Sequence, residues 1–329
     1  MIRISQLKLP LGHSRQDLER KAARALGVRE RQVEDLSILR QSVDARKKPE
    51  IFYSYTVDVK LKGADEAKLL RRGACRNASL VSEKPYRCPE PGKDCLLTPP
   101  VIIGTGPAGL FCGLLLARKG YRPILLERGR DVDRRTQDVK RFWEGGPLDP
   151  SSNVQFGEGG AGTFSDGKLN TLVKDTSGRN REVLRILTQF GADPSVCYES
   201  RPHIGTDVLS RVVKAIRQEI LSLGGQVYFE SQVTDLRIEE GRLKGLVLEK
   251  GEEIPAQAAV LAIGHSARDT FSMLLKRGVK LEPKPFAVGL RIQHPQSMID
   301  ESQYGGTIKE LGPAPYKVTW KSASGRGIY

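Results

Sequence analysis

Hydrophobic and polar residues alternate at the start of the chain, and apolar positions then recur at helical spacing, which predicts a strand followed by a helix. Ser14 stands where a side chain would cap that helix, and Gly27 stands where the helix would end. Two strand-like runs and a short helix follow, at residues 36–45, 51–61 and 64–71. The order strand, helix, strand, strand, helix predicts a small basic α+β domain over residues 1–78.

Periodicity is lost over residues 79–99, where prolines interrupt a polar segment and predict a linker. Residues 100–329 then alternate short apolar strands with amphipathic helices, as in a parallel sheet covered by helices. Strand-like runs after residue 226 predict an inserted antiparallel meander, and residues 258–264 predict a buried parallel strand. The expected fold class is α/β: a Rossmann-like domain with inserted antiparallel β segments, preceded by the small α+β domain.

The strand predicted at residues 101–103 runs into a Gly-x-Gly-x-x-Gly turn, and a helix is predicted after it. We expect Gly104 to form the tight turn, Gly106 to let the backbone approach a pyrophosphate, and Gly109 to let the helix pack on the strand. The N–H groups and the positive end of the helix would then face the phosphates. This arrangement predicts a dinucleotide-binding site.

A second predicted strand, at residues 123–126, ends in Glu127, which lies 18 residues after Gly109. A carboxylate at this spacing can accept hydrogen bonds from a ribose diol, and it disfavours the 2′-phosphate of NADP. Arg128 follows, with two open interpretations: contact with a phosphate or with adenine, and simple surface charge.

A second glycine-rich stretch covers residues 153–169 and holds five glycines between residues 157 and 167. Phe156 and Phe164 flank it, unlike the residues of a flexible linker. We expect the backbone here to come close to something planar or anionic, with a purely structural loop as the alternative. Further along the chain, Tyr198, Arg201 and His203 are either candidates to face a substrate or ordinary loop residues.

The formal net charge is +14, and residues 1–100 hold 21 lysines and arginines against 13 aspartates and glutamates. A basic surface of this kind can attract nucleic acid or anionic substrates, although a solvated basic face is the simpler interpretation. No apolar run is long enough to span a membrane, and the N-terminus lacks a signal region, so a cytoplasmic location is expected. Five cysteines without a Cys-x-x-Cys pair favour free thiols and predict no metal site.

Four motifs together resemble the glutathione-reductase-type FAD fold: Gly-x-Gly-Pro-Ala-Gly, Glu-Arg-Gly at 127–129, Val233 within a meander, and Ala-Ile-Gly at 262–264. Residues 153–169 and 289–295 further resemble a bacterial group described as uncharacterised FAD-dependent, or NAD(FAD)-utilising, dehydrogenases. The small N-terminal domain is similar to that group too, so the resemblance covers the whole chain.

The resemblance implies FAD as the cofactor and assigns residues to each part of it. The pyrophosphate would be held by Gly104, Gly106, Pro107, Ala108 and Gly109. Glu127 would bind the adenosine ribose, Arg128 would lie near the adenine, and Val233 would offer its backbone to the adenine. The flavin side would be lined by Gly159, Gly160, Gly162, Thr163 and Lys168, with Ala262 and Gly264 packing over the cofactor.

The resemblance predicts an FAD-dependent oxidoreductase whose flavin accepts a hydride or electrons from an unknown substrate. His265 and Arg291 are candidates for the substrate side, but no catalytic residue is assigned. The family's later strand and final helix beside the flavin are missing from this sequence, so we expect a C-terminally truncated chain. There is one Gly-x-Gly-x-x-Gly, so no separate nicotinamide domain is expected. The alternatives are a nucleic-acid- or partner-binding protein that uses the flavin domain as scaffold or redox sensor, and an NAD-dependent dehydrogenase.

Overall fold

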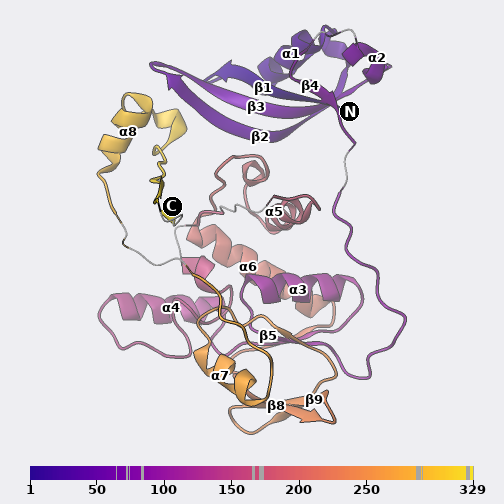
Figure 1. Cartoon of the computed structure of the whole chain (residues 1–329), viewed down its shortest axis with the longest axis vertical. Coiled ribbons are helices and arrows are strands. Elements are labelled where there is room, and N and C mark those ends of the chain that lie inside the picture. Colours follow the sequence, from indigo (N-terminus) through magenta and orange to yellow (C-terminus); the bar gives the residue numbers. More distant parts are fainter. Residues whose placement is uncertain are drawn as a thin grey trace. The chain divides into compact units, whose positions relative to one another are not determined.

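A computed structural model describes the chain except for residues 64, 72, 74, 83–84, 165–166, 170–173, 287–289, 291, 324–326 and 329 (Figure 1). The chain divides into two compact units. Unit 1 comprises Met1–Lys84, Cys197–Ser200 and Pro285–Tyr329, and unit 2 comprises Pro85–Val196 and Arg201–Lys284. Residues 285–329 therefore group with the N-terminal part of the chain, whereas the sequence placed them in the dinucleotide-binding domain.

Unit 1 is built on a four-stranded sheet in the order β2-β3-β1-β4, with helices on one face (Figure 1). Its elements are β1 (Ile2–Pro10), α1 (Arg15–Leu26), the 3-10 turn η1 (Glu30–Gln32), β2 (Val33–Lys47), β3 (Glu50–Leu61), α2 (Glu66–Arg71) and β4 (Ala78–Leu80). As predicted, Ser14 caps α1, here in a capping box with Asp17, and Gly27 ends the helix in a left-handed conformation. Alternate residues of β1 and β3 pack against the apolar face of α1 and form the core of this sheet.

The C-terminal part of unit 1 packs on the far end of the long β2–β3 hairpin. It contains α8 (Gln296–Tyr304), η4 (Lys309–Leu311), β12 (Trp320–Lys321) and β13 (Gly327–Ile328). Ile51 of β3 forms a small core with Ile299, Tyr304 and Ala314. Residues 197–200 join the same unit because the Gln41 amide of β2 donates to the Tyr198 carbonyl at 2.7 Å.

Unit 2 contains the parallel sheet that the sequence predicted, and its strand order is β11-β5-β6-β7. The strands are β5 (Val101–Ile103), β6 (Ile124–Leu126), β7 (Gln226–Tyr228) and β11 (Ala259–Leu261). The helices are α3 (Pro107–Arg118), α4 (Val132–Trp143), α5 (Arg179–Gln189), α6 (Thr206–Ser222) and α7 (Arg268–Lys276), with 3-10 turns η2 (Ala161–Phe164) and η3 (Pro194–Cys197). An antiparallel meander, β8 (Val233–Glu239), β9 (Arg242–Leu248) and β10 (Glu253–Pro255), completes the unit.

Side chains of the parallel sheet alternate between its two faces, and each face packs against different elements. Ile102 and Leu125 point toward α3, where they approach Gly109 and Gly113 respectively. Val101, Ile103 and Leu126 point the other way and pack against the meander and α7. The sheet is therefore a three-layer arrangement with its core on both faces, typical of Rossmann-like domains.

One expectation about the last strand of this sheet was wrong. β11 is parallel to β5, as predicted, but it is not buried: Val260 is 39% exposed and Leu261 is 44% exposed. The reason is its position, because β11 is the edge strand in the described sheet, so an apolar sequence alone did not reveal its exposure. No helix in the described part of the chain has the length and apolar character needed to cross a membrane.

Candidate functional site

The first glycine turn joins β5 to α3, and its three glycines meet different surroundings. Gly104 has a φ of +100°, and a Cβ there would lie 2.5 Å from the carbonyl oxygen of Ala262. A Cβ on Gly109 would lie 1.9 Å from the Gly104 carbonyl oxygen, so only glycine lets α3 pack this closely on the strand. A Cβ on Gly106 would have its nearest neighbour at 3.8 Å, which is an ordinary contact. The fold therefore explains Gly104 and Gly109 but not Gly106.

The N-terminus of α3 opens beside this turn. Gly106 is the N-cap, and Pro107 occupies the first helical position, where its missing N–H costs nothing. Pro107 and Ala108 are exposed, so the first turn of the helix is accessible. The first amides of an α-helix lack intrahelical acceptors and carry the positive end of the helix dipole. This end of α3 is suited to an anion such as a phosphate.

The second glycine-rich stretch packs directly against the first. The Gly159 amide donates to the Thr105 carbonyl at 2.9 Å. A Cβ on Gly160 would lie 3.0 Å from Pro107 Cδ and 3.2 Å from Gly106 Cα, so the backbones approach closely. The structure thus brings together the two stretches that the sequence singled out, at the exposed start of α3.

Glu127 is buried, and its carboxylate accepts hydrogen bonds from three segments, at Thr105, Gly129 and Gly157. Oε2 accepts hydrogen bonds from the Thr105 amide at 2.8 Å and the Thr105 hydroxyl at 2.9 Å. Oε1 accepts from the amides of Gly129 at 2.9 Å and Gly157 at 3.1 Å. A carboxylate has about four acceptor positions. All of them are taken by the protein, so a ribose hydroxyl would have to displace one of these donors.

Arg135 is the site residue that the sequence did not reveal. Its guanidinium is fully buried and donates to five backbone carbonyls of the glycine-rich loop: Asn153 at 2.9 Å, Val154 at 3.0 Å, Gly157 at 3.3 Å, Glu158 at 2.6 Å and Gly160 at 3.0 Å. It also lies 4.7 Å from the centre of the Phe164 ring. Burial lowers the pKa of Arg135 to about 10, and the charges of Glu127 and Glu158 oppose this shift. The group is therefore a cation at neutral pH.

The signal for Arg135 was present in the spacing of α4. Val132 and Val139 are both 1% exposed, and Arg135 lies between them on the same face of the helix. The many charged residues around Arg135 in the sequence favour a helix whose side chains are all exposed to solvent. An arginine on the apolar stripe of an otherwise charged helix is the observation that would have identified it.

A second buried charge pair lies under the same loop. Glu158 is 0% exposed; its Oε2 accepts from the Val132 amide, and its Oε1 lies 2.8 Å from Arg217 Nε. The two atoms form an ion pair without a hydrogen bond between them. Burial raises the pKa of Glu158, while the Val132 amide and the Arg217 charge lower it. This pair anchors the loop to α6.

Thr163 carries the clearest vacant hydrogen-bonding capacity in the loop. It is 0% exposed, and its hydroxyl has no hydrogen-bond partner among the described residues. A Cβ on Gly159 would lie 2.2 Å from this hydroxyl oxygen, so a glycine at position 159 is what makes room for the Thr163 side chain. Among the described residues, no atom lies within 4 Å of the position that a Cβ on Gly162, one residue before, would take. Buried hydroxyls usually have partners, so an unpartnered one points to a ligand or to solvent.

Of the two residues predicted at the adenine end, Arg128 is engaged by protein groups and Val233 lies in the core. Arg128 donates to Asp269 Oδ1 at 3.0 Å and to the Thr270 hydroxyl at 3.1 Å, and its guanidinium lies 4.4 Å from the centre of the Phe156 ring. Val233 begins β8 and is 4% exposed in the core.

The predicted residues after β11 lie beyond the C-terminal end of that strand. The Ala262 amide donates to the Ile103 carbonyl at 2.9 Å, which holds Ala262 against the first glycine turn. Gly264 has a φ of +70° and is exposed, as is His265. The C-terminal ends of parallel strands are the usual binding edge of such sheets.

The remaining candidates are spread between the units. Lys168 is exposed, and its backbone forms an isolated bridge with His203, which places both in unit 2 near the end of the glycine-rich stretch. Arg201 also belongs to unit 2, whereas Tyr198 belongs to unit 1. Arg291 lies outside the described residues.

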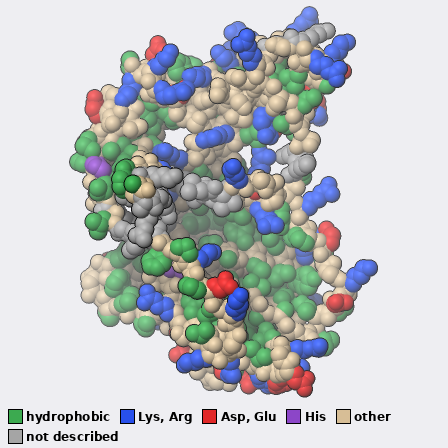
Figure 2. Space-filling model, in the orientation of Figure 1, with side chains coloured by type: hydrophobic (Ala, Val, Ile, Leu, Met, Phe, Trp, Pro, Cys, Tyr) green, Lys and Arg blue, Asp and Glu red, His purple; other side chains and the backbone are tan. Residues whose placement is uncertain are grey.

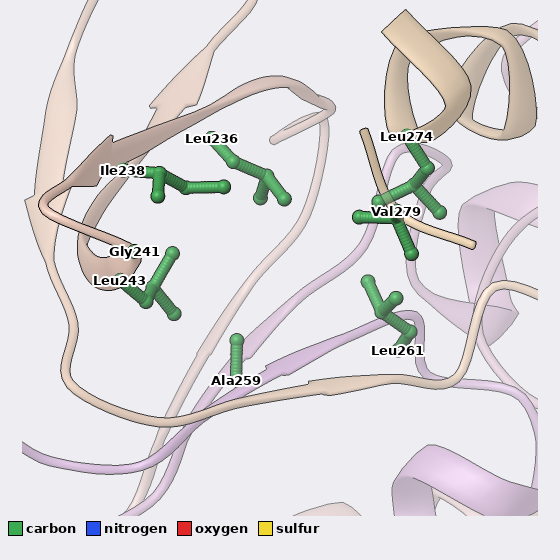
Figure 3. Close-up of a pocket in the computed structure, with 8 residues that line it drawn as sticks. All are labelled: Leu236, Ile238, Gly241, Leu243, Ala259, Leu261, Leu274 and Val279. Carbon is green, nitrogen blue, oxygen red and sulfur yellow. The ribbon is translucent and has the colours of Figure 1, made fainter. Parts of the chain in front are cut away.

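A separate pocket of about 260 Å³ lies between the meander, β11 and α7 (Figure 3). Its walls are aliphatic apart from Gly241: Leu236, Ile238, Leu243, Ala259, Leu261, Leu274 and Val279. Ligand sites generally combine an apolar wall with a few polar groups that orient the ligand. This pocket lacks such groups and is not our candidate site.

Lys and Arg side chains are scattered over the face shown in Figure 2. Within the described residues, no group of three or more His, Cys, Asp or Glu side chains could hold a metal ion.

Comparison with family models gave two matches. Residues 285–329 match the model "FAD-dependent protein, C-terminal domain-like", and residues 1–60 match a domain of unknown function. The first match begins at the residue where unit 1 resumes after unit 2. An uncharacterized protein of Clostridium beijerinckii is 44% identical over 331 residues, covering 100% of this chain and 61% of the relative. The chain therefore spans less than two thirds of that relative's length.

Two solved structures show partial similarity. The THI4 protein of Thermovibrio ammonificans is 22% identical, with 56% of this chain and 64% of that chain covered at a TM-score of 0.36. Thioredoxin reductase of Lactococcus lactis is 16% identical, with 50% and 34% covered at a TM-score of 0.28. At these TM-scores, the fold assignment rests instead on the strand order and the glycine contacts. The family match confirms the resemblance to FAD-dependent proteins predicted from the sequence: residues 285–329 match the C-terminal domain-like model of FAD-dependent proteins, in a chain that also contains a Rossmann-like α/β unit.

Proposed function

We propose that unit 2 binds FAD with its pyrophosphate at the N-terminus of α3, and that the protein is an FAD-dependent oxidoreductase. The observation that carries the proposal is the environment of Gly106. Its neighbours leave room for a side chain, and its φ of −66° suits any residue. A glycine that neither packing nor backbone conformation requires, at the exposed start of α3, is explained by close approach of a ligand.

The surrounding residues fit a dinucleotide. Amides at the start of α3 would donate to the pyrophosphate, and Gly160 narrows the same space from the other side. The unpartnered Thr163 hydroxyl and the open side of Gly162 leave hydrogen-bonding capacity and room along the glycine-rich loop. We assign Gly159, Gly160, Gly162 and Thr163 to the flavin side on this basis.

The structure suggests a more indirect role for Glu127 than the resemblance implied. Its carboxylate already accepts four hydrogen bonds from Thr105, Gly129 and Gly157. We propose that Glu127 first shapes the turn and the loop, and that it binds the ribose by sharing or exchanging one of these donors. The burial of its carboxylate still disfavours a phosphate on the ribose, because two anions would meet there.

A bound isoalloxazine would supply the redox chemistry, accepting a hydride or electrons from a substrate. The protein's own part is to hold the dinucleotide and to leave the flavin side accessible. Lys168 is the exposed candidate near the flavin, and His265 is the exposed candidate on the substrate side. His265→Ala tests the second: a reductive half-reaction that slows at unchanged FAD affinity supports a substrate role, and an unchanged rate removes it.

The binding proposal is tested by titrating the chain with FAD and following the quenching of flavin fluorescence. We expect wild-type protein to bind, and Gly106→Ala to lose at least about tenfold in affinity, because its methyl group would occupy the space of the pyrophosphate. The stability of the FAD-free variant should match wild type. Equal FAD affinity of the two proteins would refute the assignment of Gly106.

A further inference from the structure

We infer that Arg135 is a positioning residue for the cofactor. Its buried side chain fixes the conformation of the glycine-rich loop, and the loop in turn lies against the N-terminus of α3. The inference rests on the proposed function, because it names the residue that prepares that same site. Arg135 itself is 0% exposed, so it acts through the loop and not by touching a ligand.

The hydrogen bonds of Arg135 are concentrated on one segment. All five carbonyls that accept from it lie between Asn153 and Gly160. Nε donates to Asn153 and Nη2 to Val154, while Nη1, with its two N–H groups, is shared among Gly157, Glu158 and Gly160. This one planar side chain therefore constrains the direction of five carbonyl groups.

The loop is shaped to fit around this side chain. Gly157 has a φ of +114°, and a Cβ there would lie 2.4 Å from Arg135 Cδ. Gly160, which accepts from Arg135, is also the residue whose Cβ would approach Gly106 and Pro107. Arg135 is therefore connected to the start of α3 through a single residue, Gly160.

Charge explains why the position is an arginine. Phe164 covers the guanidinium on one side, and Glu127 and Glu158 supply the two nearby negative charges. A lysine could place its charge in the same region, but an ammonium has three donors and no fixed plane. A methionine would fill much of the volume and leave all five carbonyls without their donor.

The test uses the whole chain in three variants: Arg135→Met, Arg135→Lys and Arg134→Met. Arg134 is the matched control because it is the preceding residue of α4 and forms surface ion pairs with Asp131 and Glu230. Its replacement by Met removes the same charge. Two quantities are measured: hydrogen exchange of the backbone amides of residues 153–164 without FAD, and the dissociation constant for FAD.

We expect Arg135→Met and Arg135→Lys to speed exchange of the loop amides and to weaken FAD binding, each by at least about tenfold. Amides of β5 and of the α3 interior should keep wild-type exchange, and Arg134→Met should match wild type in both quantities. If Arg135→Met does not fold, Arg135→Lys decides. Wild-type loop exchange and FAD affinity in Arg135→Lys would overturn the inference, as would equal acceleration across β5, α3 and the loop, which indicates a merely structural role.

The two proposals fail in different ways. A wild-type chain that does not bind FAD would overturn the proposed function, while the exchange measurement would still report whether Arg135 fixes the loop. A wild-type chain that binds FAD, with Arg135→Lys binding equally well, would overturn the role of Arg135 and leave the proposed function standing.

Discussion

Glu127 and Arg135 hold opposite sides of the same residue. The Gly157 amide donates to Glu127 Oε1 at 3.1 Å, and the Gly157 carbonyl accepts from the Arg135 guanidinium at 3.3 Å. One charge comes from the end of β6 and the other from α4, so the position of Gly157 depends on two elements at once. The glycine-rich loop is therefore held in place by the protein's own buried charges.

Replacement of Gly109 should damage the fold rather than only the site. Gly109→Ala places a methyl group 1.9 Å from the Gly104 carbonyl oxygen, and neither backbone can move without disturbing the contact between β5 and α3. We expect a loss of about 3 kcal/mol in the free energy of unfolding of unit 2, measured by urea titration. Gly106→Ala is the control in the same turn and should change it by less than about 0.5 kcal/mol. Similar losses in the two variants would contradict this division of roles.

Neutralising Glu127 should weaken the loop connections. Each carboxylate oxygen of Glu127 accepts two hydrogen bonds, from Thr105 at Oε2 and from Gly129 and Gly157 at Oε1. In Glu127→Gln an NH₂ group replaces one of these oxygens. Because an NH₂ group cannot accept, the two donors that face it are left buried without an acceptor. The expected cost is about 1–3 kcal/mol in the free energy of unfolding. Urea titration at neutral pH measures it, and a variant as stable as wild type would show that these hydrogen bonds contribute little.

Two glycines of the loop should respond oppositely to the same substitution. Gly159 has a φ of +86°, and its Cβ would lie 2.2 Å from the Thr163 hydroxyl, so Gly159→Ala should destabilise the FAD-free chain by about 1–3 kcal/mol. Gly162→Ala meets no atom within 4 Å and should leave that stability unchanged. If Gly162 faces the flavin, its variant should instead lose FAD affinity. Loss of stability without loss of affinity in Gly162→Ala would contradict its assignment.

Acid should weaken unit 1 through Asp300. The carboxylate is 5% exposed and accepts from the Ala314 amide and Gln296 Nε2, both at 2.8 Å, and these hydrogen bonds hold the pKa of Asp300 below its ordinary 3.8. Because the folded-state pKa is lowered, the stabilisation is present above the unfolded-state pKa and is lost as the pH falls through the folded one. Asp300→Asn should therefore flatten the acid dependence of thermal unfolding below about pH 4. The exposed Asp94→Asn is the control, and identical slopes in wild type and Asp300→Asn would contradict the prediction.

The local features of the site could be predicted from the sequence because short stretches encode them. A strand, a glycine turn, a helix and an acid at fixed spacing were enough to place Gly104, Gly109 and Glu127. The tertiary features could not be, because they depend on distant partners. Arg135 is buried by a loop about twenty residues later, and β11 is exposed because nothing in the described sheet pairs with its outer edge.

The domain organisation shows the same limit. Residues 285–329 follow unit 2 in sequence, yet their core contacts are with Ile51 of the N-terminal hairpin. No periodicity in either segment signals this pairing, since two half-buried faces become recognisable as partners only once both are folded. The family match that begins at residue 285 marks the boundary independently of the contacts.

The most direct test of the account is the visible absorbance spectrum of the purified chain after incubation with excess FAD and desalting, with Gly106→Ala beside it. The account predicts that wild-type protein retains a flavin spectrum, that the variant retains much less, and that both unfold with the same midpoint without FAD. A wild-type chain that is folded but stays colourless, and that shows no quenching on titration with FAD, would contradict the assignment of the cofactor site to the start of α3.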